Sequence, residues 1–125
     1  MRKPTKKTII KKLDALVTLV IKHRDKHKCQ RCGKKVTGSN CHWSHVVTRG
    51  NKHLRWDFQN SMVLCYPCHI RWWHNEPLEA AKWFAEKFPE RYEYLMVERN
   101  KIKPLSLQDL IDLYEELKPY AVGLA

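Results

Sequence analysis

The residues of this chain best suited to chemistry are two pairs of cysteines, each with a Cys-x-x-Cys spacing. The first pair is Cys29 and Cys32, and the second is Cys65 and Cys68. A two-residue spacer lets both thiolates of a pair reach one tetrahedral ion at about 2.3 Å, and Gly33 after the first pair permits a tight turn. Two such pairs are typical of a structural zinc site at the base of a hairpin. Four thiolates leave the ion no open position, so this zinc would hold the fold and do no chemistry.

Other interpretations of these cysteines are two redox pairs, disulfides, or cysteines buried by chance. No segment of the sequence has the pattern of a secretory signal peptide, and in a reducing cytosol metal ligation is favoured over disulfides. The chain has five cysteines, and the fifth, Cys41, belongs to neither pair. We expect Cys41 to be a small buried residue beside the zinc and not a fifth ligand.

A second group of side chains lies between the cysteine pairs and just beyond them. It comprises His42, His45, Asn60 and His69. On a helix that starts near Pro67, Cys68 would face the zinc, and His69 would lie about 100° further around the axis. The imidazole of His69 would then point into the space beside the preceding strands. We therefore expect a second site there, distinct from the zinc.

The spacing of these residues resembles that of the HNH (ββα-metal) endonuclease superfamily. The similar pattern covers about residues 29–75 and runs from Cys29-x2-Cys32 through His45 and Asn60 to Cys65-x2-Cys68-His69. Within the superfamily, the chain is most similar to the phage recombination nucleases of the NinG/Rap type, which act on branched DNA. That narrower likeness is carried by Cys41-His42-Trp43-Ser44-His45, Thr48-Arg49, Leu54-Arg55 and Asn60. The resemblance implies a ββα-metal fold, a divalent metal and DNA as the substrate.

The resemblance also implies a role for each residue of the second site. His45 would be the general base, Asn60 would orient it and brace the hairpin loop, and His69 would be a catalytic metal ligand. The superfamily usually has Asp as the metal ligand directly before the catalytic histidine, where this chain has Ser44. In NinG-like proteins an acidic residue stands earlier, at the position of His42. We therefore carry the first metal ligand over to His42, with Ser44 as the alternative.

The chemistry of phosphodiester hydrolysis is compatible with these roles. A neutral imidazole can take the proton of a water molecule near pH 7, and a bound cation can stabilise the charge of the transition state. A pair of imidazoles suits Mn²⁺, Co²⁺ or Ni²⁺ better than the hard ion Mg²⁺, so we expect Mn²⁺ to be preferred. His74 follows His69 by five residues, which is roughly 140° around an α-helix. We therefore do not expect His74 to share the ion.

The elements that must position these side chains begin with a helix. Apolar residues recur every three or four positions from Thr5 to about Lys26, a pattern that predicts an amphipathic helix. Two short runs, Asn40–Thr48 and Leu54–Phe58, predict the strands of a hairpin. The polar segment 48–53 between them predicts a functional loop.

Prolines divide the rest of the chain into helices. Pro67 predicts the start of a short helix that runs to about Asn75. Three further helices are expected in the segments that Pro77, Pro89 and Pro104 separate. The last has the capping-box spacing Ser106-Leu107-Gln108-Asp109. We thus expect one α+β domain over residues 1–125, with a zinc-bound ββα-metal core at about 27–75, a basic helix at about 5–26 and a helical part at about 77–120.

The charge of the chain predicts an anionic partner. The 125 residues carry a formal net charge of +11, and residues 1–75 alone hold 17 Lys and Arg against 3 Asp and Glu. Such a surplus favours nucleic acid as the partner. We expect phosphate contacts from four residues in or beside the loop: Arg49, Lys52, His53 and Arg55. No run of apolar residues is long enough for a membrane span.

Together these features predict a metal-dependent DNA endonuclease that nicks duplex or branched DNA with low sequence specificity. We expect a monomer or weak dimer in the cytoplasm, encoded by a bacterium or a phage. The alternative is a non-catalytic zinc-knuckle protein that binds DNA on an HNH scaffold. The histidine that replaces the usual metal-binding Asp is the feature that favours this alternative.

Overall fold

The N-terminal amphipathic segment forms helix α1, Lys6–Arg24, in a computed structural model that describes residues 4–101 and 103–124. The side chain of Thr5 accepts a hydrogen bond from the backbone N–H of Thr8 and caps the first turn. One face of α1 is buried at a spacing of four residues: Ile9, Leu13, Val17 and Ile21. The predicted helix is therefore confirmed, although it ends earlier than expected because Lys26 and His27 adopt positive φ angles of 56° and 54°.

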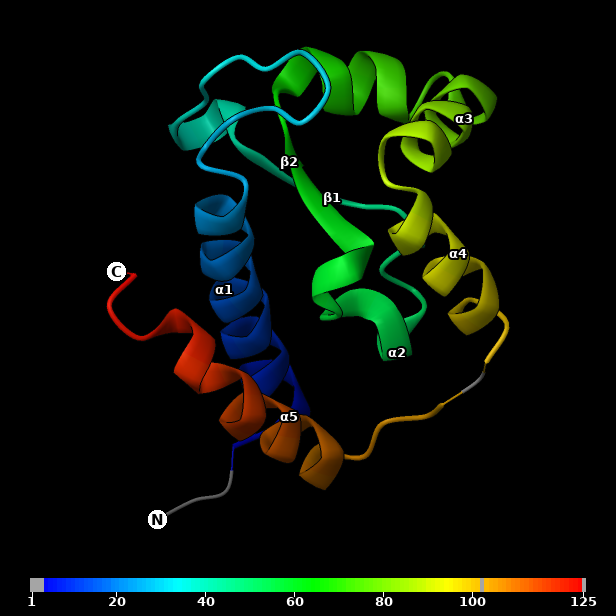
Figure 1. Cartoon of the computed structure of the whole chain (residues 1–125). Coiled ribbons are helices and arrows are strands. Elements are labelled where there is room, and N and C mark those ends of the chain that lie inside the picture. Colours follow the sequence, from blue (N-terminus) through cyan, green and yellow to red (C-terminus); the bar gives the residue numbers. More distant parts are fainter. Residues whose placement is uncertain (1–3, 102, 125) are drawn as a thin grey trace.

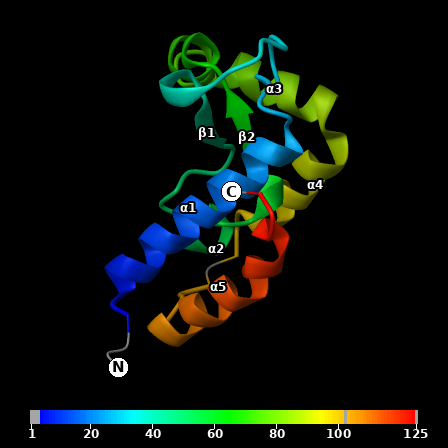
Figure 2. The same cartoon turned by 90° about the vertical axis from the view of Figure 1, so that its left-hand side faces the viewer.

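Helix α5, Leu107–Ala121, packs along α1 and covers one side of the molecule (Figure 1). The two helices also lie side by side when the molecule is turned by 90° (Figure 2). The predicted capping box is present, since Ser106 and Asp109 each accept a backbone N–H of the other. Leu110 and Leu117 are the buried residues of this helix. Helix α5 thus covers one side of the basic helix α1.

A small antiparallel sheet of strands β1, His42–His45, and β2, Ser61–Leu64, packs against α1. His42 pairs with Leu64, and His45 pairs with Ser61. The first predicted strand is confirmed in a shorter form, but the second, placed at Leu54–Phe58, is wrong. The alternation of apolar Leu54 and Trp56 suggested a strand, yet both side chains are buried in and just after a short helix. All four residues of β2 are buried, so this strand has no alternating pattern to reveal it.

The connection between the strands contains helix α2, Lys52–Arg55, which spans the end of the predicted loop 48–53 and the start of the wrongly predicted strand. A 3₁₀ turn, Phe58–Asn60, then leads into β2, and another, Gly38–Asn40, precedes β1. The chain therefore returns from β1 to β2 through two tight helical turns. This compact return fixes the backbone near His45.

The remaining helices begin at prolines, as predicted. They are a helix of π geometry at Pro67–Trp73, α3 at Pro77–Lys87 and α4 at Pro89–Glu98. Proline is tolerated in a first helical turn because its missing N–H would have no partner there.

One cluster of buried side chains extends through these elements. It runs from Ile9 in α1 through Trp56 and Val63 to Phe84 in α3 and Leu117 in α5. The fold is therefore α+β, mostly helical, with a two-stranded antiparallel sheet at its centre. No helix in the described part of the chain is long and apolar enough to cross a membrane.

Candidate functional site

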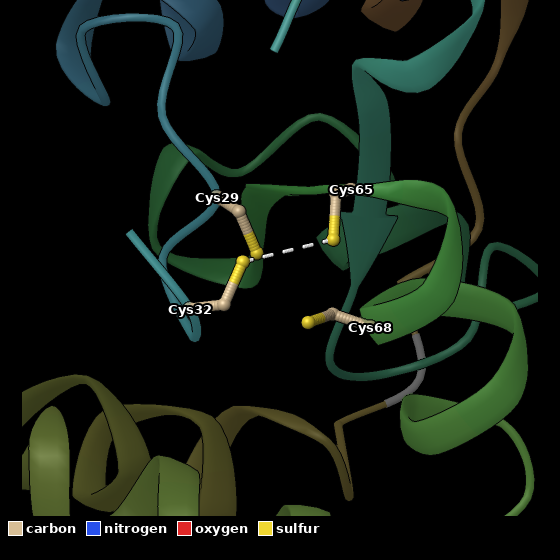
Figure 3. A group of neighbouring side chains, drawn as sticks. All are labelled: Cys29, Cys32, Cys65 and Cys68. Atoms are coloured by element: carbon tan, nitrogen blue, oxygen red, sulfur yellow. Dashed lines mark hydrogen bonds between the residues drawn. The ribbon is translucent and has the colours of Figure 1, made fainter. Parts of the chain in front are cut away.

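The four predicted zinc ligands come together in space (Figure 3). The sulfur atoms of Cys29, Cys32, Cys65 and Cys68 all lie within 4.8 Å of one another. The first pair sits in the knuckle after α1, where the N–H of Gly33 donates to the carbonyl of Cys29 at 2.9 Å and Gly33 has a φ of 77°. The second pair connects the end of β2 to the Pro67–Trp73 helix. The cluster could hold a metal ion such as zinc.

The spacing and electrostatics of the cluster fit a tetrahedral ion. The sulfurs of Cys32 and Cys65 are 3.8 Å apart, close to the separation of about 3.8 Å that two thiolates at about 2.3 Å from one ion would have. All five cysteines are free thiols, and Cys41 is buried outside the cluster. Burial raises the pKa of the Cys29 thiol, but backbone N–H bonds, led by that of Cys32, outweigh it and lower the pKa to about 7. A thiol of this kind readily gives the thiolate that a metal requires.

Arg31 adds a positive charge beside the thiols. Its guanidinium donates to the sulfur of Cys68 at 3.7 Å and stacks on Trp72 with 3.9 Å to the ring centroid. A metal bound by four thiolates carries a net negative charge, which a neighbouring guanidinium stabilises.

The predicted catalytic metal ligands His42 and His69 are also in contact. Their Nδ1 atoms lie 2.9 Å apart, although His42 begins β1 and His69 sits on the Pro67–Trp73 helix. The Nε2 of His42 is 2.9 Å from the carbonyl of Ser39, and since a carbonyl only accepts, this nitrogen carries the proton. When His42 is neutral, its Nδ1 is therefore an acceptor, and the Nδ1 of His69 donates to it. A cation that replaced this shared proton would meet a lone pair from each ring.

His74 joins this group, contrary to the prediction that it would lie elsewhere on the helix. Its Nε2 is 3.0 Å from the Nε2 of His69. The prediction assumed an α-helix, whereas the N–H of His74 bonds to the carbonyl of His69 at 3.1 Å, five residues earlier. This wider π turn brings residues five apart onto the same side of the helix.

The imidazoles of the three histidines lie in a row, which we call the histidine chain, and their nitrogens do not converge on one point. His69 meets His42 through Nδ1 and His74 through Nε2, on opposite sides of its imidazole. In the described residues, the four cysteines are the only group in which three or more ligand atoms converge. An ion between His42 and His69 would therefore have two protein ligands and several positions for water or phosphate.

The geometry of this histidine pair fits such an ion. Two nitrogens bound at right angles at about 2.1 Å would be about 3 Å apart, which matches the observed separation of the two Nδ1 atoms. Burial, followed by the charges of His74, His42 and His45, lowers the pKa of His69 to about 4. The ring is thus neutral at physiological pH, as a metal ligand must be.

His45, the predicted general base, is held by the backbone. Its Nε2 lies 3.1 Å from the carbonyl of Arg55 and therefore carries a proton, which leaves Nδ1 with the lone pair. Burial is the main cause that lowers the pKa of His45 to about 4, and the charges of Arg49 and Arg55 lower it further, while the carbonyl opposes them. His45 is thus a neutral imidazole of fixed tautomer. A phosphate bound nearby would raise its pKa.

Asn60 braces the connection that carries this carbonyl. Its side chain is fully buried, accepts from the N–H of Val47 at 2.7 Å, and donates to the carbonyls of Val47 at 2.9 Å and Leu54 at 3.0 Å. The bond to His45 comes from the next residue, Arg55. Asn60 therefore acts on His45 through the backbone that it holds.

Asp14 in α1 is a further residue of the site, which sequence reasoning missed. Its carboxylate accepts from Arg55 at 2.6 and 3.1 Å, from the indole of Trp56 at 2.8 Å and from Arg49 at 3.2 Å. The signal in the sequence was that Asp14 is the only acidic residue among the first 24. An isolated acid on a lysine-rich helix could have been recognised as a partner for arginines elsewhere.

The four predicted phosphate contacts differ in how they are presented. Arg49 is 56% exposed, and Lys52 is also exposed. The side chains of Arg55 and His53 are only 15% and 12% exposed, and each pairs with an acid, Arg55 with Asp14 and His53 with Glu98 at 3.2 Å. Arg49 also contacts Asp14 at 3.2 Å, but more than half of its side chain is exposed, so Arg49 and Lys52 are the two most accessible to a ligand.

A cavity of about 270 Å³ opens beside the predicted base. His45, Thr48, Trp73 and His74 are among the residues that line it. The indole of Trp73 donates to the carbonyl of His45 at 3.1 Å and ties the helix to the strand. Both His45 and His74, which is one end of the histidine chain, therefore line the same cavity.

Comparison with known proteins gives no match to this chain among family models, curated proteins or solved structures. We therefore base its function on the chemistry of the histidine site.

Proposed function

We propose that this protein is a metal-dependent DNA endonuclease of the HNH (ββα-metal) type, with His45 as its general base. The observation that carries the proposal is the state of His45. Its Nε2–H is fixed by the Arg55 carbonyl, so its free Nδ1 can accept a proton next to a cavity that His74 also lines. A partly buried, neutral imidazole of one fixed tautomer, near the proposed metal ligands, can take a proton from water.

The residues of the site divide the work of phosphodiester hydrolysis. His45 takes the proton of the attacking water. The segment that orients His45 is held by Asn60, which bonds to its backbone at Leu54, and by Asp14, which bonds to the side chain of Arg55. A divalent ion held by His42 and His69 would supply Lewis-acid stabilisation of the charge on the phosphate. Arg49, exposed beside the site, would bind the backbone phosphate. The resulting positive charge on His45 would be stabilised by the bound phosphate.

The substrate class follows from charge. The surplus of positive charge in residues 1–75 suits a polyanion, and contacts to phosphates carry no sequence information. We therefore propose duplex or branched DNA, cut with low sequence specificity, as for the NinG/Rap-type nucleases that the sequence resembles. One site in a monomer or weak dimer would cut one strand at a time.

The second candidate is a DNA-binding zinc-knuckle protein without catalysis. It is favoured by the absence of the superfamily's usual metal-binding Asp, since this chain has Ser44 directly before His45 and His42 at the earlier ligand position. Ser44 is fully buried, so its hydroxyl is not accessible from solvent. The site then depends on His42 as its first metal ligand.

Cleavage of supercoiled plasmid at fixed salt separates the two candidates. The protein is incubated with Mn²⁺, with Mg²⁺ or with no added divalent ion, and its binding to the same DNA is measured in parallel. An endonuclease with one site per chain gives open circles before linear molecules, and only when the ion is added. Binding without ion-dependent nicking would support the zinc-knuckle candidate.

A further inference from the structure

A second cavity borders the connection between the strands. Its volume is about 550 Å³, within the usual range of ligand pockets. One wall is formed by residues 50–53, and the other by the segment after α4, with Arg99, Lys101 and Lys103. The side chain of Asn51 donates to the carbonyl of Arg99 at 3.3 Å and so ties the two walls together.

The lining of this cavity is strongly basic. Lys52, Arg99, Lys101 and Lys103 all contribute to it. The acidic neighbour is Glu98, which pairs with Lys101 and, at 3.2 Å, with His53. The lining thus holds four cationic side chains and no acidic one. A cavity of this charge attracts an anion.

The cavity also has an apolar part. Pro104 and Leu105 line it next to the lysines. A nucleotide combines a charged phosphate with the less polar faces of a sugar and a base, so it matches both parts of the lining. Inorganic anions would use the cations alone.

Helix α2 connects this cavity to His45. Its last residue, Arg55, supplies the carbonyl that orients His45, and its first residue, Lys52, lines the cavity. Four helical residues span about 6 Å, so the cavity begins about one helical turn from the predicted base. A DNA strand with one phosphate at His45 would bring a neighbouring nucleotide towards it.

We propose that this cavity binds the phosphate ester of a nucleotide, and that the strand engaged at His45 supplies it. That the bound phosphate ester belongs to a DNA strand rests on the proposed function. The binding of a phosphate ester does not, because a free nucleotide would be held by the same groups.

The test measures DNA affinity against salt concentration with no divalent ion added, so that no cleavage is needed. The variant Arg99→Gln/Lys103→Gln is compared with Lys82→Gln/Lys118→Gln, which removes the same charge from exposed positions on α3 and α5. Each lost phosphate contact reduces the slope of log affinity against log salt by about 0.9. We expect a reduction of about 2 for the cavity variant and little change for the control.

A second arm titrates the wild type and the cavity variant with a free deoxynucleoside monophosphate, followed by NMR of backbone amides. Shifts at Gly50 and Asn51 that weaken in the variant, together with an unchanged salt slope, would support the phosphate-ester site with a free nucleotide as its ligand. Equal slopes for both double variants and no nucleotide-dependent shifts would overturn the proposal. Both arms are independent of plasmid nicking, so failure of the endonuclease proposal is seen separately.

Discussion

His45 and His69 share an unusual state, since both are partly buried histidines whose pKa is lowered to about 4. A general base works best when its pKa is close to the working pH, so His45 in the free protein is weaker than the ideal. Anionic DNA at the site would raise its pKa towards neutrality. The low pKa of His45 keeps its imidazole unprotonated at neutral pH.

These two residues make stability depend on pH. A histidine in the unfolded chain has a pKa of about 6.5, so between about pH 6.5 and pH 4 the unfolded state binds protons that the folded state does not. The free energy of unfolding should therefore fall as the pH is lowered through this window, by up to about 1.4 kcal/mol per pH unit for each such residue. Urea unfolding of the wild type and of His45→Gln at pH 7, 6 and 5 measures this. The variant should lose stability less steeply, and identical slopes would show that His45 is protonated in the folded state as easily as in the unfolded state.

The identity of His42 should set the preference for the catalytic metal. Two imidazoles suit Mn²⁺ better than Mg²⁺, which favours oxygen ligands. We expect faster initial nicking in Mn²⁺ than in Mg²⁺ at equal concentration for the wild type, and a shift towards Mg²⁺ for His42→Asp. Wild-type activity that is equal in the two ions, or an unchanged ratio in the variant, would show that His42 is not a ligand.

At the scale of elements, the sequence predicted those helices whose limits are set by local signals. Three kinds of local signal predicted helices correctly: the apolar period of α1, the capping box of α5, and the prolines that begin the Pro67–Trp73 helix, α3 and α4. Each of these signals acts within a few residues. Strand β2 was missed because its four residues are all buried, so its limits depend on tertiary packing. The position of His74 was missed because a single extra residue per turn in a π-helix leaves no mark in the sequence.

The candidate site was partly predictable for the same reason. The grouping of the four cysteines followed from their spacing. The pairing of His42 with His69, whose Nδ1 atoms lie 2.9 Å apart, was expected from the family resemblance and not from spacing. The role of Asp14 followed from neither, because its partners Arg55 and Trp56 are about 40 residues away in the chain. Long-range contacts of a single side chain have no periodic signal.

Asp14 should matter to the orientation of His45. In Asp14→Asn, the neutral amide holds Arg55 less strongly, so the Arg55 carbonyl is less well fixed and a lower nicking rate is expected. The loss of a hydrogen bond between charged groups also costs about 1–3 kcal/mol of stability. DNA affinity should rise instead, because the variant frees two arginines from a carboxylate. Asp112→Asn on the exposed face of α5 is the matched control.

Parallel measurements of nicking rate and of DNA affinity check this prediction. If Asp14→Asn lowered both together, or left the nicking rate at the level of Asp112→Asn, Asp14 would have no positioning role.

At the scale of the whole molecule, the four-cysteine cluster joins segments that the helices alone do not hold. Cys29 and Cys32 follow α1, whereas Cys65 and Cys68 join β2 to the helix that carries His69. Zinc at this point would fix the hairpin, α1 and the histidine chain relative to one another. Structural zinc sites contribute on the order of 10 kcal/mol to folding.

One tightly bound zinc per chain should therefore survive dialysis. In Cys65→Ser we expect zinc to be lost and the thermal unfolding transition to shift strongly downwards. Cys41→Ser is the control, because Cys41 is equally buried but lies outside the cluster, and it should keep its zinc. Elemental analysis gives the zinc content. Wild-type zinc content and unfolding in Cys65→Ser would contradict the assignment.

The central claim is that His45 removes the proton of the attacking water. It is tested most directly by the initial rate of plasmid nicking in Mn²⁺ for the wild type and for His45→Ala, with DNA affinity measured on the same samples. Loss of a general base typically lowers a rate by 10²–10⁴-fold, while phosphate contacts such as that of Arg49 remain. We predict a loss of this size with affinity nearly unchanged, and a variant that nicks at close to the wild-type rate would contradict the claim.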